Sequence, residues 1–533
     1  MSLMAAAALV ASTPASAQLG NILHKAKEAA GKAERVKAMV TPDETVKTMR
    51  LQELLRGVQI KENNGINREK EITALCTDSR KCTPGALFIA VEGAESDGHN
   101  YIDAAIENGA TTIVCQREVE RREGIDYLLA EGGREMVATI ASNFYGNPSK
   151  ELNLVGVTGT NGKTSIATLL YRLFTKLGYS CGLLSTIANY VGEKRYETIN
   201  TTPGPIELNA LLRQMANSGC EYCFMEVSSH ALDQQRTAGL HFRGAIFTNL
   251  THDHLDYHKS FANYLACKKS LFDNLPKEAF ALVNADDRNG KVMVQNCKAQ
   301  ISTYSCRGYA DFCGKVIEKS IEGMLLRING TEVWCRFIGM HNASNLTAIY
   351  GAAILLGAES QEVIRIMSEL TSVAGRLEYF IGPRNIIAVV DYAHTPDALE
   401  NVLRTLADLK PAGELICLFG CGGNRDKSKR PEMGAIAGKY ADRIVVTSDN
   451  PRFEDPAEIM NDIKAGMERS VLSRSLFIAD RREAIRTAII MAKESSIVLV
   501  AGKGHEDYQI IAGVKHHLDD REIIKELFNE LKG

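Results

Sequence analysis

Residues 152–165 read LNLVGVTGTNGKTS and decide the fold of the chain around them. An apolar run is followed by a glycine-containing turn and then by the helical pattern IATLLYRLF. The backbone N–H groups of such a turn and the positive end of the helix bind phosphate, and Lys163 adds a mobile charge. The Thr164 hydroxyl is placed to bind Mg²⁺. The usual pattern begins with a glycine where this chain has Val157, and the alternative is an ordinary strand-to-helix turn. Because strand, GKT and helix coincide, we favour a nucleoside triphosphate site.

The bulk composition narrows the class of protein. A chain of 533 residues is too long for one typical domain, and its 45% hydrophobic and 24% charged content is that of a globular protein. The formal net charge of −3 gives no sign of nucleic-acid binding. Thirteen cysteines without a framework of paired CxxC motifs indicate free thiols in a reducing, cytoplasmic setting. No apolar run approaches the roughly 20 residues of a membrane-spanning helix.

The first 48 residues differ from the rest of the chain. They begin with a signal-like apolar run that ends in Ala15-Ser16-Ala17 but lacks a basic start. Met49 resembles a natural chain start. We interpret residues 1–48 as a fusion or start-site artefact or a disordered extension, and set them aside. Export is the rival interpretation, and it conflicts with an ATP-dependent core.

Three α/β domains are predicted from the order of apolar runs. Residues 49–146 contain short strands around a Pro-Gly turn, then a helix and a strand. Residues 147–374 alternate strands and helices, which predicts a parallel, doubly wound, P-loop ATPase-like sheet. Alternation restarts in residues 375–533, which predicts a second, Rossmann-like domain. Ligands of such sheets collect at the carboxyl ends of the strands.

Polar residues concentrate at the predicted strand ends of the central domain. The run 248–258, TNLTHDHLDYH, holds three His and two Asp within seven positions, which indicates metal or phosphate chemistry. Zinc is conceivable, but Mg²⁺ fits better because Glu226 ends a neighbouring strand and no cysteine ligand pattern is present. The alternatives are solvated loop histidines, and for the Ser-Ser pair after Glu226 a helix cap.

The C-terminal domain carries a second group of strand-end residues. Arg452, in Asp449-Asn450-Pro451-Arg452, offers a planar fork for a carboxylate, and Glu506 could pair with an ammonium. Together they could hold an amino acid by its own charges. The alternative is a mutual surface salt bridge worth at most ~1 kcal/mol. Cys421, in the glycine-rich run 420–431, lacks a basic partner pattern and is interpreted as structural.

A series of motifs between residues 49 and 533 resembles one family. In order these are TGTNGKTS, NTTPG, EVSSHALDQQR, TNLTHDHLDYH, YLACKKSLF, NADD, GMHNASN, GRLE, DYAHTPDALE, GCGGNRDKSKRP, DNPR and GKGHEDYQ. They resemble the Mur ligases, ATP-dependent amide-forming enzymes of peptidoglycan precursor synthesis. The resemblance implies that ATP phosphorylates the D-glutamate carboxylate of UDP-N-acetylmuramoyl-L-alanyl-D-glutamate. An amine of the incoming amino acid then attacks the acyl phosphate, and the tetrahedral intermediate collapses to an amide and free phosphate.

The resemblance also implies roles for particular residues. The residues implied around ATP are Gly159, Thr160, Asn161, Gly162, Lys163, Thr164, Ser165, Asn342, Asn345, Arg376, Asp391 and His394. Those implied around the UDP-muramoyl dipeptide are Ser79, in the first domain, and Asn200, Thr201, Thr202, Ser228, Gln234 and Arg236. The implied catalytic residues are Lys163, Glu226, His254 and Lys268. The implied Mg²⁺ ligands are Thr164, Glu226, His254 and Lys268, the last as a carbamate. Without that modification Lys268 is expected to be a surface cation.

The motif DNPR implies that the third substrate is meso-2,6-diaminopimelate. This amino acid has a second ammonium-carboxylate centre that lysine lacks, so an arginine there disfavours lysine. The implied contacts are Arg425, Asp449, Asn450, Pro451, Arg452, Gly502 and Glu506. Three alternatives remain: an L-lysine-adding relative, a folylpolyglutamate-type ligase, and a non-catalytic, nucleotide-dependent binding protein. We expect a cytoplasmic monomer with hinge motion between its domains.

Overall fold

The computed structural model describes residues 48–62, 66–93, 96–198, 200–251, 253–409 and 413–532. We interpret residues 1–48 as an artefact or extension. Residues 1–47 lie outside the described residues, and only residue 48 of this segment is described. The chain divides into two compact units. The first contains the chain up to Pro148 with Lys194–Ile199 and Pro203–Asn217, and the second contains the remainder. No helix in the described ranges is long and apolar enough to cross a membrane.

The first unit is built on a small, mostly parallel sheet. Its strand order is β2-β7-β6-β5-β4, and only the β2–β7 pair is antiparallel. The strands are β2 (Ile60–Glu62), β4 (Leu75–Cys76), β5 (Ala86–Ala90), β6 (Ala110–Cys115) and β7 (Asp126–Ala130). Helices α3 (Ile102–Glu107), α4 (Arg134–Phe144) and α6 (Pro205–Asn217) belong to the same unit. The predicted strands, Pro-Gly turn and helix are all present, whereas β2 and β7 were not predicted.

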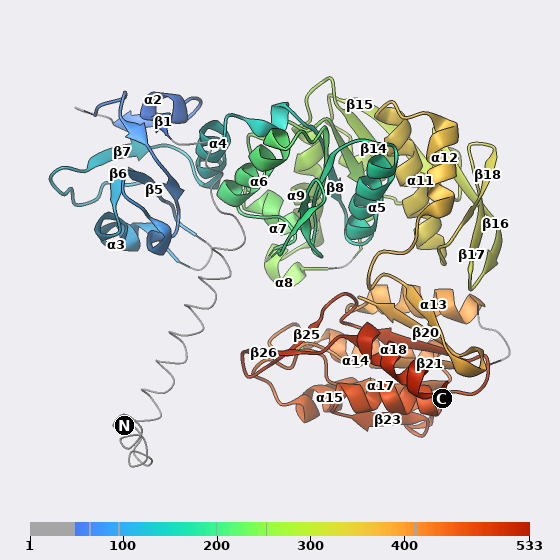
Figure 1. Ribbon diagram of the computed structural model, residues 1–533. Coiled ribbons are helices and arrows are strands. Elements are labelled where there is room, and N and C mark those ends of the chain that lie inside the picture. Colours follow the sequence, from blue (N-terminus) through green and yellow to red (C-terminus); the bar gives the residue numbers. More distant parts are fainter. Residues whose placement is uncertain are drawn as a thin grey trace, which may run out of the picture. The chain divides into compact units, whose positions relative to one another are not determined.

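The second unit contains the phosphate loop on a large mixed sheet (Figure 1). Neighbouring strands run β10-β9-β12-β8-β13-β14-β15-β16-β17-β18, and those from β9 to β16 are parallel. The predicted strands are β8 (Asn153–Thr158), β9 (Cys181–Leu184), β12 (Tyr222–Glu226), β13 (Gly244–Phe247) and β14 (Phe280–Asn284). The parallel core is thus confirmed, and the phosphate loop follows its β8.

Antiparallel strands that the sequence did not predict extend this core on both sides. They are β10 (Asn189–Val191) beside β9, and β17 (Gly323–Ile328) and β18 (Thr331–Cys335), which follow β15 (Gln300–Ser305) and β16 (Phe312–Ser320). In β16 only the first and third residues are buried, and the rest of the strand is partly or fully exposed to water. The central sheet is therefore mixed rather than purely parallel.

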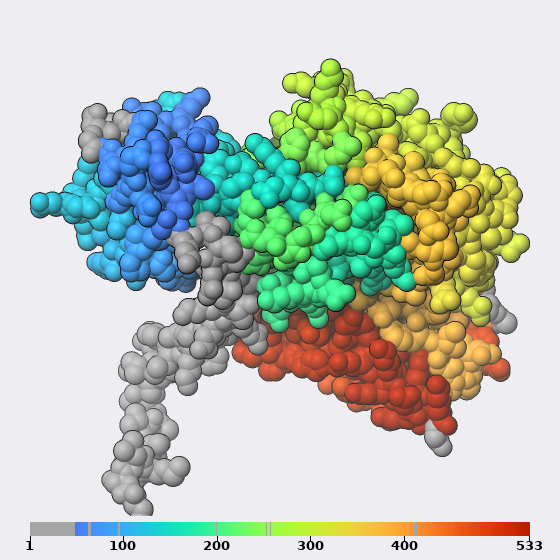
Figure 2. Space-filling model, turned by 45° about the horizontal axis from the view of Figure 1, so that its top comes forward, coloured from blue at the N-terminus to red at the C-terminus, as the bar shows by residue number. Residues whose placement is uncertain are grey.

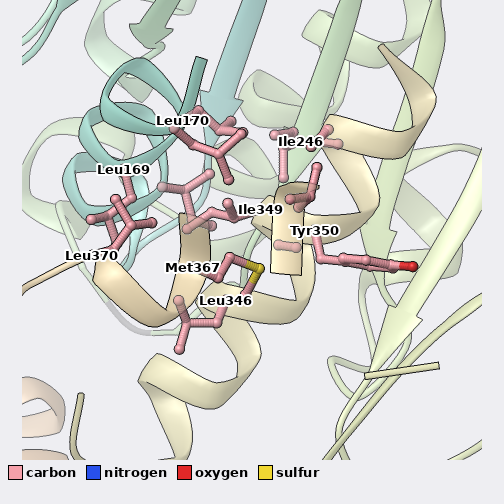
Figure 3. Packing of buried hydrophobic residues seen from close by; sticks show 14 of the residues in the cluster. Leu169, Leu170, Ile246, Leu346, Ile349, Tyr350, Met367 and Leu370 are labelled. Atoms are coloured by element: carbon pink, nitrogen blue, oxygen red, sulfur yellow. The ribbon is translucent and has the colours of Figure 1, made fainter. Parts of the chain in front are cut away.

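Three helices pack against each other over this sheet. They are α5 (Lys163–Lys176), α11 (Met340–Leu355) and α12 (Ser360–Glu369). Figure 3 shows Leu169 and Leu170 of α5 facing Leu346 and Ile349 of α11, with side chains of α12 closing the group. In the space-filling view these helices and the neighbouring strands form a continuous body (Figure 2). This buried layer fixes α5, and with it the start of the helix at the phosphate loop.

A second, six-stranded sheet carries the C-terminal residues in the order β19-β20-β24-β21-β22-β23. Its strands are β19 (Glu378–Ile381), β20 (Ile387–Asp391), β21 (Leu415–Phe419), β22 (Arg443–Thr447), β23 (Ser475–Ile478) and β24 (Ile497–Ala501), and only β19 is antiparallel. Val389 faces the layer of α13 (Pro396–Leu409) and α14 (Lys429–Tyr440), and Val390 faces α17 (Arg481–Ile490) and α18 (Asp520–Glu530). The alternation confirms a doubly wound, Rossmann-like domain.

The remaining elements are short or peripheral. In the first unit, β1 (Met49–Arg50) pairs with β3 (Glu71–Ile72), and α2 (Leu51–Leu54) follows β1. The other helices are α7 (Ser229–Asp233), α8 (Leu255–His258), α9 (Phe261–Asp273), α10 (Gly290–Met293), α15 (Pro456–Lys464) and α16 (Arg469–Leu472). A hairpin of β25 (Tyr508–Ile511) and β26 (Val514–His517) follows β24. This hairpin pairs with the DNPR loop, because Arg452 donates its backbone N–H to the Ile510 carbonyl at 3.0 Å.

Candidate active site

Two glycines are required by the shape of the phosphate loop. Gly159 has φ +145° and Gly162 has φ +92°. A Cβ on Gly159 would lie 1.9 Å from Thr248 Oγ1, and one on Gly162 would lie 2.7 Å from Asn345 Oδ1. Val157 lies inside strand β8 and is fully buried, so the turn starts only at Gly159. A glycine at position 157 is therefore not needed to form this turn.

The loop's own lysine is bonded to the loop. Lys163 Nζ donates to the carbonyls of Gly159 and Thr160, both at 2.9 Å. Burial lowers the pKa of Lys163, and the carboxylates Glu226 and Asp253 oppose that shift. The amine is thus held where the backbone N–H groups converge, and incoming phosphate oxygens would compete for it.

A buried oxygen pair lies at the start of α5. Thr164 Oγ1 donates to Glu226 Oε2 at 2.9 Å, and Glu226 Oε1 accepts from the Thr186 backbone N–H at 2.8 Å. Glu226 is only 1% exposed. Arg376 Nη2 lies 3.3 Å from Thr164 Oγ1. A hydroxyl and a carboxylate are the hard oxygen donors that Mg²⁺ prefers, so these residues fit that ion.

The acidic and histidine-rich run only partly enters this site. His254 has a left-handed backbone (φ 53°), and its Nε2 lies 3.4 Å from Asp253 Oδ2. The rings of His254 and His230 are 4.9 Å apart. His252 lies outside the described residues. The density of polar groups was visible in the sequence, but which histidine faces the phosphate loop was not.

A mixed group of possible metal ligands was missed by the sequence reasoning. One ligand atom each from Asp233, His258 and Cys267 lie within 4.8 Å of one another. Cys267 Sγ donates to the Ser229 carbonyl at 3.0 Å, and burial raises the pKa of this thiol to about 11. The thiol is therefore protonated in the metal-free protein, and of these three residues only His258 belongs to the run 248–258 for which zinc was considered.

Lys268 is not the surface cation expected of an unmodified lysine. It is 1% exposed, its Nζ donates to the Gly159 carbonyl at 2.8 Å, and it lies 4.7 Å from the centre of the Tyr264 ring. Burial and the neighbouring Lys163 lower the pKa of Lys268 well below its usual value. A lowered pKa increases the share of the neutral amine, which is the form that can be carbamylated.

A cavity of about 860 Å³ in the second unit collects most predicted residues. Of the predicted ATP residues, it is lined by Thr160, Asn161, Gly162, Lys163, Thr164, Ser165, Asn342, Asn345, Arg376, Asp391 and His394. Of the others, it is lined by Asn200, Thr201, Thr202, Ser228, Arg236, Glu226 and His254. Gly159, Gln234 and Lys268 are not in its lining, and neither are the seven residues predicted for the amino acid, which lie elsewhere in this unit.

The residues predicted around the nucleotide are held by short contacts. Asp391, at the end of β20, accepts the backbone N–H groups of Leu377 and Ala393, both at 2.8 Å, while burial raises the pKa of its carboxyl group. Arg376 stacks 4.7 Å from the Tyr392 ring. Burial lowers the pKa of His394, so its ring is neutral at pH 7.

Asp397 is a lining residue that the sequence reasoning quoted in a motif but did not assign. Its Oδ2 accepts from Asn161 Nδ2 at 3.1 Å and from Thr251 Oγ1 at 3.2 Å. A carboxylate thus lies against the phosphate loop. Its position at the first turn of α13 gave no sign of this contact, because acidic residues are common there.

The residues predicted to hold the muramoyl dipeptide form a connected network. Thr202 Oγ1 donates to the Glu226 carbonyl, and Arg236 Nη1 donates to the Thr202 carbonyl, both at 2.8 Å. Gln234 Oε1 accepts from Arg236 Nη2 at 2.7 Å. Ser228 caps helix α7 by accepting from the Ala231 N–H at 3.2 Å. The predicted capping role is thus confirmed next to a buried carboxylate.

Ser79 lies in the first unit and is described there alone. It begins a short 3-10 helix directly after β4, and Asp78 caps this helix through the Arg80 N–H. Ser79 is 6% exposed, and its carbonyl accepts from Asn108 Nδ2 at 3.2 Å. The polar cluster at a strand end is therefore present as predicted.

The residues predicted for the amino acid gather at the ends of β22 and β24. Asn450 Nδ2 donates to Glu506 Oε2 at 2.9 Å, and Lys503 Nζ lies 3.1 Å from the same oxygen. A Cβ on Gly502 would lie 2.5 Å from Asp449 Oδ2, so the two loops touch at a glycine. Glu506 pairs with Lys503 and not with Arg452, so the mutual Arg–Glu salt bridge is absent from this part of the described chain.

Two arginine side chains lie beside the glycine-rich loop of the same cluster. Arg452 Nη1 donates to the Gly423 carbonyl at 2.8 Å, and a Cβ on Gly422 would lie 2.9 Å from this nitrogen and 3.7 Å from Arg425 Cγ. Within the described ranges, Arg425 and the Nε and Nη2 groups of Arg452 have no hydrogen-bond acceptor. Burial and the nearby Arg425 lower the pKa of Arg452. Guanidinium donors without an acceptor are suited to an anion such as a carboxylate. Cys421 is buried behind it, in contact with Met433, as expected of a structural residue.

Profiles of known protein families match three segments of the chain. The profile described as the Mur ligase middle domain matches residues 157–353, and the glutamate ligase domain of the Mur ligases matches residues 375–504. The catalytic domain profile of the Mur ligase family matches residues 71–145. The chain belongs to the Mur ligase family. The predicted three-domain α/β fold is that of this family.

The relatives of this Mur ligase carry a specific name. The UDP-N-acetylmuramoyl-L-alanyl-D-glutamate–2,6-diaminopimelate ligase of Phocaeicola vulgatus is 53% identical, over 90% of this chain and 99% of its own. The enzyme of that name from Caldanaerobacter subterraneus is 40% identical over the same shares. A solved structure under that name has a TM-score of 0.67 and 30% identity, covering 91% of this chain and all of its own. The MurF ligase of Thermotoga maritima in complex with ADP, at 18% identity and a TM-score of 0.60, covers 86% of this chain and 98% of its own and shares the fold.

Proposed function

We propose that this Mur ligase uses ATP to join meso-2,6-diaminopimelate to the D-glutamate carboxylate of UDP-N-acetylmuramoyl-L-alanyl-D-glutamate, releasing ADP and phosphate. The relatives at 53% identity over 90% of the chain carry the name of that reaction. The reaction is a step of peptidoglycan precursor synthesis, and the enzyme acts as a cytoplasmic monomer. Residues 49–146 hold the uridine diphosphate group through Ser79, residues 147–374 hold ATP, and residues 375–533 hold the amino acid.

The phosphate loop has the charge and geometry to activate a carboxylate. The backbone N–H groups after Gly159 and the start of α5 converge on one end of the cavity, where phosphate is stabilised by the helix terminus. Lys163 exchanges its two carbonyl contacts for phosphate oxygens and neutralises the negative charge that develops during transfer. Thr202, Ser228 and Arg236 line the same cavity and orient the acyl group toward that end.

Thr164 and Glu226 are the residues that fit Mg²⁺ best, with His254 and a carbamylated Lys268 as further contributors. When bound, the ion would screen the charge on the phosphate oxygens. A carbamate on Lys268 adds a negative charge beside Lys163, within reach of the Gly159 carbonyl that its amine now contacts. Carbamylation thereby converts the buried Lys268 amine into an anion that can hold Lys163 and the metal ion in place.

The paired guanidinium groups beside Gly422 carry the choice of amino acid. Arg452 is half-buried with two donor groups to spare in the described chain, and Arg425 is exposed beside it. A carboxylate placed there would relieve the repulsion between the two cations and gain charge-assisted hydrogen bonds. Glu506 and Asn450 lie on the adjoining loop and suit the matching ammonium. L-Lysine as the substrate has no second carboxylate, so Arg425 and Arg452 would have no anion to bind.

The test is a product assay that offers meso-diaminopimelate and L-lysine side by side. Phosphate release should require ATP, the UDP-muramoyl dipeptide and diaminopimelate together, and lysine should support it at least about 100-fold less well. Equal use of lysine would support the L-lysine-adding alternative. Phosphate release with neither acceptor present would support a nucleotide-dependent binding protein instead.

A further inference from the structure

A fully buried ion pair lies beneath the loops assigned to the amino acid. Arg481 begins helix α17 and Asp520 begins helix α18. Both side chains are 0% exposed. Arg481 Nε donates to Asp520 Oδ1 at 2.8 Å and Nη2 donates to Asp520 Oδ2 at 2.7 Å. This two-point contact fixes the plane of the guanidinium and leaves its outer edge for other acceptors.

That outer edge joins two strands that do not pair with each other. Arg481 Nη2 donates to the Ala501 carbonyl at 3.0 Å, and Nη1 lies 3.4 Å from the Ser448 carbonyl. Ala501 ends β24, and Ser448 follows β22. Strand β21 lies between β24 and β22, so no ladder hydrogen bond connects these two described strand ends. The guanidinium supplies a direct link across this gap.

The chain makes room for this link. β21 ends at Phe419 and is followed by Gly420. A Cβ on Gly420 would lie 2.3 Å from the Thr447 carbonyl and 3.0 Å from the Asp449 backbone nitrogen. Only glycine therefore lets the loop after β22 fold over the end of β21, toward the loop after β24.

The two linked residues directly precede the amino-acid loops. Ser448 leads into Asp449–Arg452, and Ala501 leads into Gly502–Glu506. These loops are also joined by the partly buried Asn450–Glu506 hydrogen bond and by Lys503 Nζ, which lies 3.3 Å from Asn450 Oδ1, and an incoming ammonium would compete for Glu506. Arg481 donates instead to a buried carboxylate and to backbone carbonyls, which the substrate would not touch, so its link persists through that exchange.

We propose that Arg481, oriented by Asp520, is a positioning residue that sets the spacing between the Asn450–Arg452 loop and the Gly502–Glu506 loop for the incoming diamino acid. The inference rests on the proposed function in naming that substrate. Loop displacements of about 1 Å can cost about 100-fold in rate when they misplace a reacting group. Loss of a positioning pair should therefore impair the use of diaminopimelate alone. Loss of a purely structural pair would impair the use of every substrate.

The chain offers a matched control in Arg474. Its guanidinium also spans two backbone carbonyls of the same domain, Gly438 at 2.6 Å and Ala441. Ala441 precedes β22, so this arginine lies at the amino ends of the strands, away from the loops. Arg474→Lys therefore removes a comparable link without touching the amino-acid loops.

The experiment compares the wild type with Arg481→Lys, Asp520→Asn and Arg474→Lys. In the first two variants the KM for diaminopimelate should rise at least about tenfold while the KM for ATP stays within about twofold. Amide exchange should quicken in residues 448–452 and 501–506 of both variants, with or without substrate. Arg474→Lys should leave both KM values and both segments unchanged.

Each other outcome counts against the proposal. The pair would have only a structural role if both KM values rose equally. The same would follow if Arg474→Lys also raised the KM for diaminopimelate more than the KM for ATP. Loss of the folded domain in both Arg481→Lys and Asp520→Asn would also indicate a structural role, since a positioning pair must be separable from the fold. If the wild type fails to use diaminopimelate, the proposed function fails, but the exchange comparison still tests the link between the loops.

Discussion

Replacing Thr164 by valine removes one hydroxyl from the centre of the proposed metal site. That hydroxyl donates to Glu226 Oε2 at 2.9 Å and lies 3.3 Å from Arg376 Nη2. A hydrogen bond to a buried carboxylate contributes about 1.5–3 kcal/mol, so the central domain should lose about that much stability. Thr168, one turn further along α5, is the matched control. Its Oγ1 is buried and has no hydrogen-bond partner in the described part of the chain, so Thr168→Val should be neutral or stabilise by about 1 kcal/mol.

Two measurements separate the structural and chemical parts of this effect. The single tryptophan of the chain, Trp334, lies on β18 of the same sheet, so its fluorescence in urea reports the stability of this domain. Phosphate release gives kcat/KM for ATP at several Mg²⁺ concentrations. Thr164→Val should lower kcat/KM about 100-fold and raise the Mg²⁺ requirement, whereas Thr168→Val should change neither. If Thr164→Val lost stability but kept wild-type kcat/KM, the hydroxyl would have no role in the chemistry.

Four further changes probe the remaining groups. Lys268→Ala should abolish activity, and added short-chain carboxylic acids, but not bicarbonate, should restore part of it; wild-type activity would remove Lys268 from the site. Arg452→Ala should raise the KM for diaminopimelate at least about tenfold more than the KM for ATP, and an equal rise would contradict its role. Asp397→Asn should lower the KM for ATP about threefold at low salt, because a negative charge is removed from beside the phosphate loop, and no change would mean that the charge is screened. Hydrogen bonds from Arg430 lower the pKa of Glu454 to about 2, so its contribution to stability is complete above pH ~4.5 and is lost as the pH falls toward 2. Glu454→Gln should therefore unfold more easily than the wild type at pH 6, and the difference should vanish near pH 2.

The parallel strands could be predicted because burial on both faces leaves a plain signal. Runs such as 154–157, 387–390 and 415–419 are continuously apolar and end in polar or glycine residues. Strands with one face in water lack this signal. The hairpin of β25 and β26 mixes tyrosine, glutamine, lysine and histidine, and β26 is wholly exposed, so its sequence resembles a loop. Its pairing with Arg452 depends on residues about sixty positions apart, which no local pattern encodes.

In the candidate site, too, some residues could be predicted from the sequence and others could not. Thr164 was predicted from the phosphate loop and Glu226 from a strand end, and the structure places them in contact. The burial of Lys268 could not be predicted, because the helix pattern around it carries a second lysine and gives no reason for either to be enclosed. Arg481 and Asp520 were likewise invisible. Each looks like an ordinary charged residue at the start of a helix, and only the fold makes the pair a link between two loops.

The contacts of the phosphate loop join it to the segment that begins the C-terminal domain. Lys163 is bonded to loop carbonyls, Asp397 accepts from Asn161, and Arg376 lies against Thr164. A triphosphate arriving at the loop attracts the cation Arg376 and repels the anion Asp397, although both belong to the same C-terminal segment. Arg376 lies just before β19 and Asp397 lies in the first turn of α13, so we expect phosphate to rotate the stretch between them rather than simply to draw it closer. Such a rotation would also turn the loops that we propose hold the amino acid, because they follow β22 and β24 of the same sheet.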